Sequence, residues 1–152
     1  MHGPPRRFED HGFQDAFEVV WGAAYHRAAD IGETLATAAR IDDGDADSWL
    51  REWTATAGGS WAAAGRAEAD GHRASALEHY LRAGTYYAAA LSHVALTDQS
   101  VNGLDLWHRQ RECWDRAVAS LPVPGEHLAI PYERTSLPGY FFRAPGARPG
   151  EP

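Results

Sequence analysis

Apolar residues recur at helical spacing through the middle of the chain and predict a central helix over residues 72–94. The apolar positions on its predicted face are Leu77, Tyr80, Leu81, Gly84, Tyr87, Ala88, Leu91 and Val94. We expect this face to be buried, with Gly84 allowing another backbone to approach closely. The pattern fits two starts for this helix, a capping box over residues 75–78 or a start at His72.

An earlier helical pattern extends over residues 13–40. Gly22 and Gly32 interrupt it, and a glycine weakens a helix interior by roughly 1 kcal/mol relative to alanine. The sequence therefore predicts either one long helix or two shorter helices that meet near residues 29–30. Residues 1–12 are mostly polar and are predicted to form a loose, disordered arm.

An acidic turn over residues 42–48 follows this pattern. Asp45 or Asp47 is expected to cap the next helix, because a carboxylate accepts the unpaired N–H groups of the first turn. This helix should run to about residue 70 and turn at Gly71 into the central helix. The two are then expected to form an antiparallel helical hairpin.

A last helix with an aromatic seam is predicted to end at Pro122. The positions that mark it are Leu104, Trp107, Arg111, Trp114, Val118 and Leu121. After Pro124 the period changes from helical to extended. This change predicts a β-hairpin from His127 to Phe142, with its turn at residues 133–136.

Three consecutive aromatic residues lie near the end of this hairpin. Because side chains alternate along a strand, Tyr140 and Phe142 should face one side and Phe141 the other. Both faces are then apolar, whereas a terminal ribbon beside a helical bundle is covered on one face only. We therefore expect the hairpin to contact a further protein chain.

Taken together, the patterns predict a mainly α protein, a bundle of four to five helices followed by a C-terminal β-hairpin. The expected divisions are the arm at 1–12, a helical domain at 13–121, the hairpin at 122–145, and a linker or truncated tail at 146–152. A length of 152 residues suits one compact domain.

The charge of the chain narrows the classes of partner. It has 14 basic and 21 acidic residues and a formal net charge of −7, so binding to nucleic acid or to an anionic membrane is not expected. No apolar run approaches the roughly 18 residues that a membrane span needs. The single cysteine, Cys113, excludes an internal disulfide, and no charged-then-apolar leader is present, so we expect a cytoplasmic protein.

Candidate catalytic and metal motifs each have a simpler structural explanation. Residues 58–62 nearly match G-x-S-x-G, but Ala62 replaces the final glycine and Ser60 lies within a helical pattern. The acidic turn lacks the glycine and glutamate of a calcium loop. The eight histidines include no pair at i, i+4 spacing. We therefore assign no catalytic residue, no metal ligand and no cofactor, and expect Cys113 to be a buried, inert thiol.

Aromatic residues make up 11% of the chain, and most of them must lie in the core. Tyr86 and Tyr87 project about 100° apart on a helix, so they cannot face the same neighbour. One of the pair is expected to line a groove or pocket. We take Trp21, Tyr25, Tyr86 and Tyr87 as candidate substrate-binding residues.

Several short stretches occur in an order that resembles a known family. In the helical half they are residues 17–41 with Gly32 and Glu33, then Ser48, Trp49 and Trp53, Gly71 and His72, residues 75–76 and 80–83, and Tyr86 with Tyr87. In the extended half they are residues 130–133 and 137–140. Over about residues 13–145, this ordered set resembles the amino-terminal region of α/β-hydrolases of the fermentation-respiration-switch esterase and dihydroxypseudooxynicotine hydrolase type.

This resemblance implies a role without chemistry of its own. In such proteins the helical segment is similar to a cap beside or over the active site, and the hairpin opens the core sheet. The Ser-Asp-His triad comes from sequence further on, so none of its residues is carried over to this chain. The resemblance implies a small-molecule substrate with an ester, amide or C–C bond. Together with the uncovered hairpin, it implies either a homodimer or a complex with a separately supplied hydrolase core.

An alternative is a tetratricopeptide-like interaction module, because a helical hairpin with Trp, Gly, Ala and Tyr at such spacing also resembles one repeat. The period of about 34 residues does not recur in the sequence, and about three stacked repeats are usually needed. The hydrolase interpretation is therefore preferred, and the chain alone is expected to be inactive.

Overall fold

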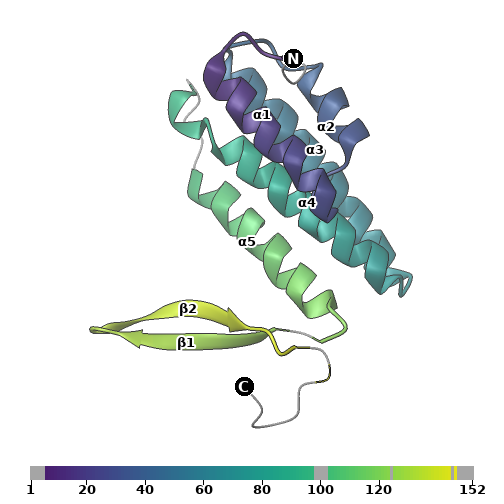
Figure 1. The fold of residues 1–152 in the computed structure, drawn as a ribbon, viewed down its shortest axis with the longest axis vertical. Helices are drawn as coiled ribbons and strands as arrows, with labels where there is room; N and C mark the ends of the chain where they lie inside the picture. The colour runs from purple at the N-terminus through teal and green to yellow at the C-terminus, as the bar shows by residue number, and fades with distance from the viewer. Residues whose placement is uncertain (1–5, 98–102, 124, 145, 147–152) are drawn as a thin grey trace.

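The computed structural model describes residues 6–97, 103–123, 125–144 and 146. They form a bundle of five α-helices followed by a two-stranded antiparallel hairpin, which confirms the predicted mainly α fold (Figure 1). The elements are α1 (His11–Ala23), η1 (Ala24–His26), α2 (Ile31–Ala38), α3 (Ala46–Ala69), α4 (Arg73–Leu91), η2 (Val94–Leu96), α5 (Gly103–Ser120), β1 (Glu126–Tyr132) and β2 (Thr135–Phe141). Apart from Gly146, the predicted tail at 146–152 lies outside the described residues.

The first helical pattern folds as two helices rather than one. Asp10 caps α1, where its carboxylate accepts the backbone N–H of Phe13 at 2.9 Å. After η1 the backbone at Arg27 is left-handed, with φ of 60°. Asp30 then caps α2 by accepting the N–H of Glu33 at 2.9 Å. Two separate caps therefore define two short helices, the second of the predicted arrangements.

The predicted hairpin of α3 and α4 forms the centre of the bundle (Figure 1). Asp45 caps α3 and accepts the N–H of Asp47 at 2.9 Å. Gly71 makes the turn with φ of 77°, which glycine adopts without steric penalty. α4 begins directly after His72, so the start at His72 is correct and Ser75 lies inside the first turn.

The largest buried side chains gather between α1, α3 and α4. Trp49 and Trp53 are fully buried, and the indole N–H of Trp49 donates to the carbonyl of Ala89 at 2.7 Å. Trp53 stacks on Tyr86 with ring centroids 5.6 Å apart. Burial of large apolar side chains contributes roughly 1.5–3 kcal/mol each. This aromatic cluster is therefore a main source of the stability of the bundle.

The prediction of a loose arm over residues 1–12 is wrong for the part of it that the structure describes. Phe8 is 1% exposed and packs edge-on against Phe17 and Trp49, with centroids 5.8 and 5.7 Å apart. The backbone N–H of Phe8 donates to the side-chain carbonyl of Gln14 at 3.0 Å. The backbone N–H groups of Glu9 and Asp10 also donate to the Asp43 carboxylate, so a buried ring and hydrogen bonds together fix this mostly polar segment. The first five residues of the arm lie outside the described range.

The prediction that one whole face of α4 is buried is also wrong. Its buried residues are Ala76, Tyr80, Ala83, Tyr86, Tyr87, Ala89 and Ala90. On the predicted face, Leu77, Leu81, Gly84, Ala88 and Leu91 are only half-buried. α4 lies between α3 and α5, and small residues let helices pack closely, so the alanines take the tightest contacts. Several of the displaced residues border a groove.

The hairpin follows α5 and extends away from the helices (Figure 1). β1 and β2 pair in antiparallel register, which ends with Tyr132 opposite Thr135. The sequence predicts the turn at residues 133–136, but it is shorter and consists of the two residues 133 and 134, which connect this last pair. The first of them, Glu133, has φ of 49°.

Candidate functional site

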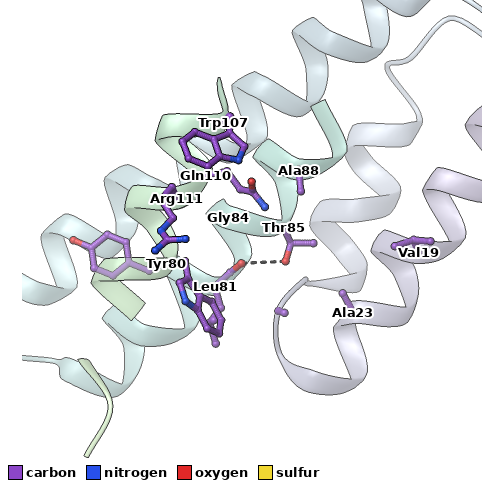
Figure 2. Close-up of a pocket in the computed structure, with 12 residues that line it drawn as sticks. Val19, Ala23, Tyr80, Leu81, Gly84, Thr85, Ala88, Trp107, Gln110 and Arg111 are labelled. Atoms are coloured by element: carbon purple, nitrogen blue, oxygen red, sulfur yellow. Dashed lines mark hydrogen bonds between the residues drawn. The ribbon is translucent and has the colours of Figure 1, made fainter. Parts of the chain in front are cut away.

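A groove of about 500 Å³ opens on α4, between α1 and α5 (Figure 2). It is lined by Val19, Ala23, Ala28, Tyr80, Leu81, Gly84, Thr85, Ala88, Trp107, Gln110, Arg111 and Trp114. Sites for small molecules are usually about 300–1,000 Å³ and mostly apolar, with a few placed polar groups. The groove has both properties.

Small residues of α4 form the floor of the groove. A Cβ atom on Gly84 would lie 3.3 Å from Cβ of Cys113, so α4 and α5 approach closely there, as predicted. Ala88 lies one helical turn further along. The hydroxyl of Thr85 donates to the carbonyl of Leu81 at 3.1 Å, as Figure 2 shows. That hydroxyl is therefore satisfied within its own helix, and the floor is largely apolar.

The wall formed by α5 carries two half-exposed indoles. Trp107 is 47% exposed and Trp114 is 42% exposed. They are seven residues apart, which is about 10 Å of helical rise. Gln110 and Arg111 lie between them and are half-buried. The wall therefore presents two aromatic surfaces with hydrogen-bond donors between them.

Arg111 connects the groove to the hairpin. Its Nε atom lies 3.4 Å from Oδ1 of Asp115, and its guanidinium lies 5.1 Å from the ring centroid of Tyr140. The Tyr140 hydroxyl donates to the same carboxylate, and its ring packs edge-on against Trp114 at 6.0 Å. Burial and the hydrogen bond to Asp115 raise the pKa of Tyr140, so the hydroxyl stays protonated as a donor.

The hairpin presents a second surface. We define the hairpin surface as Leu128, Ile130, Tyr132, Leu137 and Phe141, which lie on one face of the hairpin and are each 42–53% exposed. Tyr140 and Phe142 stack with ring centroids 6.1 Å apart, as expected for one face of a strand, and the alternation places Phe141 on the other. Both strands are exposed along most of their length. The hairpin surface is therefore apolar and open.

None of the four predicted substrate-binding residues lines the groove. Tyr86 is 0% exposed and Tyr87 is 4% exposed, so both belong to the core. Trp21 packs edge-on against Phe17 at 5.3 Å. Tyr25 is 88% exposed on the surface. A role for these four residues in substrate binding stays a prediction.

The two adjacent tyrosines face different neighbours, as their helical positions predict. The hydroxyl of Tyr86 accepts the backbone N–H of Asp30 at 2.8 Å and donates to Oε2 of Glu33 at 2.8 Å. Tyr87 instead lies near Arg109 of α5. Burial raises the pKa of both hydroxyls. Tyr86 therefore anchors the start of α2.

The sequence assigns the groove residues of α5 to the packed face of the last helix rather than to a groove. Its pattern puts Trp107, Arg111 and Trp114 in the seam of the last helix. Of the predicted seam, α5 buries Val118, and its other buried residues are Leu106, Cys113 and Ala117. The signal that could have separated these two faces is Arg111, because a charged residue within an aromatic stripe indicates a surface rather than a core.

The structure supplies no catalytic alternative among the predicted motifs. Ser60 is 5% exposed inside α3, as expected of a helix serine. Burial raises the pKa of Cys113 to about 12, so its thiol stays protonated and is a poor nucleophile. Among the described residues, no three His, Cys, Asp or Glu side chains are placed to share a metal ion. None of the helices in the described ranges is long and apolar enough to cross a membrane.

No protein-family model matches the chain, but several curated proteins do. The chain is 33% identical over 131 residues to Hydrolase LUC6 of a Fusarium species. This match covers 86% of the chain and 31% of LUC6. The chain is 33% identical over 151 residues to alpha/beta hydrolase psoB of Aspergillus fumigatus, in a match that covers 93% of the chain and 32% of psoB. The chain is 31% identical over 144 residues to 20-hydroxy-prefusarin hydrolase FUS2 of Gibberella moniliformis, in a match that covers 90% of the chain and 34% of FUS2.

The chain thus spans about a third of the length of these relatives. Each of them is named a hydrolase, so the tetratricopeptide-like alternative is not favoured. The resemblance noted in the sequence is confirmed at this broader level: the chain is related in sequence to the α/β hydrolases.

Proposed function

We propose that this chain is the cap and sheet-opening region of a serine α/β hydrolase of the fermentation-respiration-switch esterase and dihydroxypseudooxynicotine hydrolase type. The helices form a cap that governs substrate access, and the hairpin joins the sheet of a catalytic core. The chain supplies no nucleophile and is inactive alone. The observation that supports this proposal most directly is the open, apolar hairpin surface.

A hairpin of this kind needs cover from another sheet and its helices. An isolated two-stranded hairpin is marginally stable in water. Strands inside an α/β sheet are covered on both faces, and free strand edges pair readily with a further strand. The side chains of the hairpin surface are 42–53% exposed, so they have apolar area left to bury. A hydrolase core would supply both the strand and the cover.

The position of the groove supports a role in substrate access. Arg111 and Trp114 line the groove and also contact Tyr140 of β2. A sheet that continued from the hairpin would therefore lie close to a ligand in the groove. We infer that the substrate is a small molecule with an ester, amide or C–C bond, for which a volume of about 500 Å³ is sufficient.

We propose a separately supplied hydrolase core, rather than a second copy of this chain, as the partner of the hairpin. A homodimer would cover the hairpin surface but would bring no nucleophile elbow. Relatives about three times as long carry hydrolase names, which favours a core in the functional unit. We place the complex in the cytoplasm, because the single cysteine of the chain is buried and forms no disulfide within it.

The DNA that adjoins the coding region of this chain provides the test. We expect it to encode a hydrolase core with a G-x-S-x-G motif, and the tagged chain to retain that core during purification. Phe141→Ser should reduce this retention, whereas Tyr25→Ser, on the exposed surface of the bundle, should not. Absence of the motif, or a core that is not retained, would contradict the proposal.

A further inference from the structure

The groove carries its hydrogen-bond donors in the middle and its aromatic side chains at the ends. Trp107, Gln110 and Arg111 follow one another along its wall in Figure 2, and Trp114 follows in the sequence. The two indoles keep 47% and 42% of their surface exposed. The contact between α5 and α4 is made elsewhere on α5, so the packing of these two helices does not account for the indoles, and Trp114 has an edge-on contact with Tyr140 of the hairpin.

Arg111 has more donors than its protein neighbours use. Its Nε atom faces the Asp115 carboxylate at 3.4 Å, and that carboxylate also accepts the Tyr140 hydroxyl. A guanidinium carries five N–H donors in a fixed plane. The side chain of Arg111 lines the groove and is 34% exposed, so donors that its neighbours do not use are open to an acceptor there. The amide of Gln110 adds further donors beside it.

This arrangement differs from a groove that binds a protein helix. Protein interfaces have an apolar centre and a polar rim. Here the polar pair is central, and the indoles lie at two ends separated by about 10 Å of helical rise. The matching ligand is elongated, apolar at both ends, and carries an acceptor oxygen near its middle.

We propose that the groove binds a small molecule in which two apolar or aromatic ends are joined through a central carbonyl, as in an ester, amide or ketone. Trp107 and Trp114 contact the two ends, and Gln110 and Arg111 donate to the carbonyl oxygen. This inference rests on the proposed function, for which it names the substrate class. The four residues bind and orient the ligand, while bond cleavage belongs to the core.

Three fluorinated probes of similar size test the proposal on the full chain by fluorine NMR. The first, para-fluorophenyl benzoate, has a central ester. The second, para-fluorostilbene, has the same shape without an acceptor, and the third, para-fluorobiphenyl carboxylate, has its acceptor at one end. The ester should bind about tenfold more tightly than either of the others, the factor expected for a hydrogen bond to a charged donor.

Two variants and one control variant locate the binding. Ala88→Leu fills the floor and should weaken ester binding at least about tenfold, whereas Ala62→Leu, on the exposed side of α3, should not change it. Gln110→Leu keeps the size of the side chain but removes its donors. It should lower the affinity for the ester toward that for the stilbene and leave the affinity for the stilbene unchanged.

Equal binding of ester and stilbene would overturn the proposal, and so would ester binding that is unaffected by both variants. Circular dichroism checks the fold of each variant, and Gln110→Leu decides the question if Ala88→Leu is unfolded. Failure of these tests leaves the docking of the core unaffected, because that docking depends on the hairpin surface. Loss of core retention with ester selectivity intact would instead count against the proposed function.

Discussion

Replacing Phe8 with alanine should lower the free energy of unfolding by about 3–4 kcal/mol. The ring is 1% exposed and packs edge-on against Phe13, Phe17 and Trp49, with centroids 5.8, 5.8 and 5.7 Å away. Its removal loses roughly 2–3 kcal/mol of burial and edge-to-face contacts worth about 0.5–1.5 kcal/mol each. Partial collapse of the segment onto the bundle recovers some of this loss.

Urea unfolding of the wild type, Phe8→Ala and Tyr25→Ala measures this effect. Tyr25 is the control, because it is 88% exposed and its truncation should change stability by less than about 0.5 kcal/mol. In a thermal scan, Phe8→Ala should lower Tm by about 6–16 °C for a domain of this size. A loss below about 1 kcal/mol would refute the burial of Phe8 and restore the loose arm.

Three further predictions address the rest of the bundle. Gly84→Leu should lower the free energy of unfolding in urea by about 1–3 kcal/mol, because the added side chain meets α5. Gly59→Leu is the control and should not lower it, because a Cβ atom at Gly59 has open space. Equal effects of the two substitutions would contradict the close approach of α4 and α5. Tyr86→Phe should lower the free energy of unfolding by about 1–3 kcal/mol, because it leaves the Glu33 carboxylate and the backbone N–H of Asp30 without their partner. A loss below about 0.5 kcal/mol would show that the Tyr86 hydroxyl does not anchor α2. Burial lowers the pKa of His93, so its contribution to stability is complete above pH about 6.5 and declines as the pH falls toward the folded value. Melting temperatures of the wild type and of His93→Asn measure this effect between pH about 7.5 and 5. The difference between the two melting temperatures should shrink as the pH falls, and a constant difference would exclude this linkage.

Local chemistry made much of the fold predictable. Asp45 follows a turn and precedes a helical pattern, so its capping role could be inferred without tertiary information. Gly71 turns α3 into α4, and the change of period after Pro124 predicts the hairpin. The alternation of Tyr140 and Phe141 likewise depends only on strand geometry.

Features set by packing were not predictable in the same way. The spacing of large apolar residues on α4 indicates a buried face, yet Ala83 and Ala90 are more deeply buried than Leu81. Small residues take these positions because α3 and α5 approach α4 closely. The groove escaped prediction for a related reason, since Trp107 has the spacing of a core residue and only the placement of the neighbouring helices leaves it half-exposed.

Whether this chain is a non-catalytic cap is decided by the rate of p-nitrophenyl ester hydrolysis, measured for the chain alone, for a hydrolase core alone, and for the two together. We predict no turnover above background by the chain, and a higher rate for the mixture than for the core. Phe141→Ser should abolish this increase, because it alters the hairpin surface. Turnover by the chain alone that disappears in Ser60→Ala would show that the chain is catalytic by itself, because it would place a nucleophile inside α3.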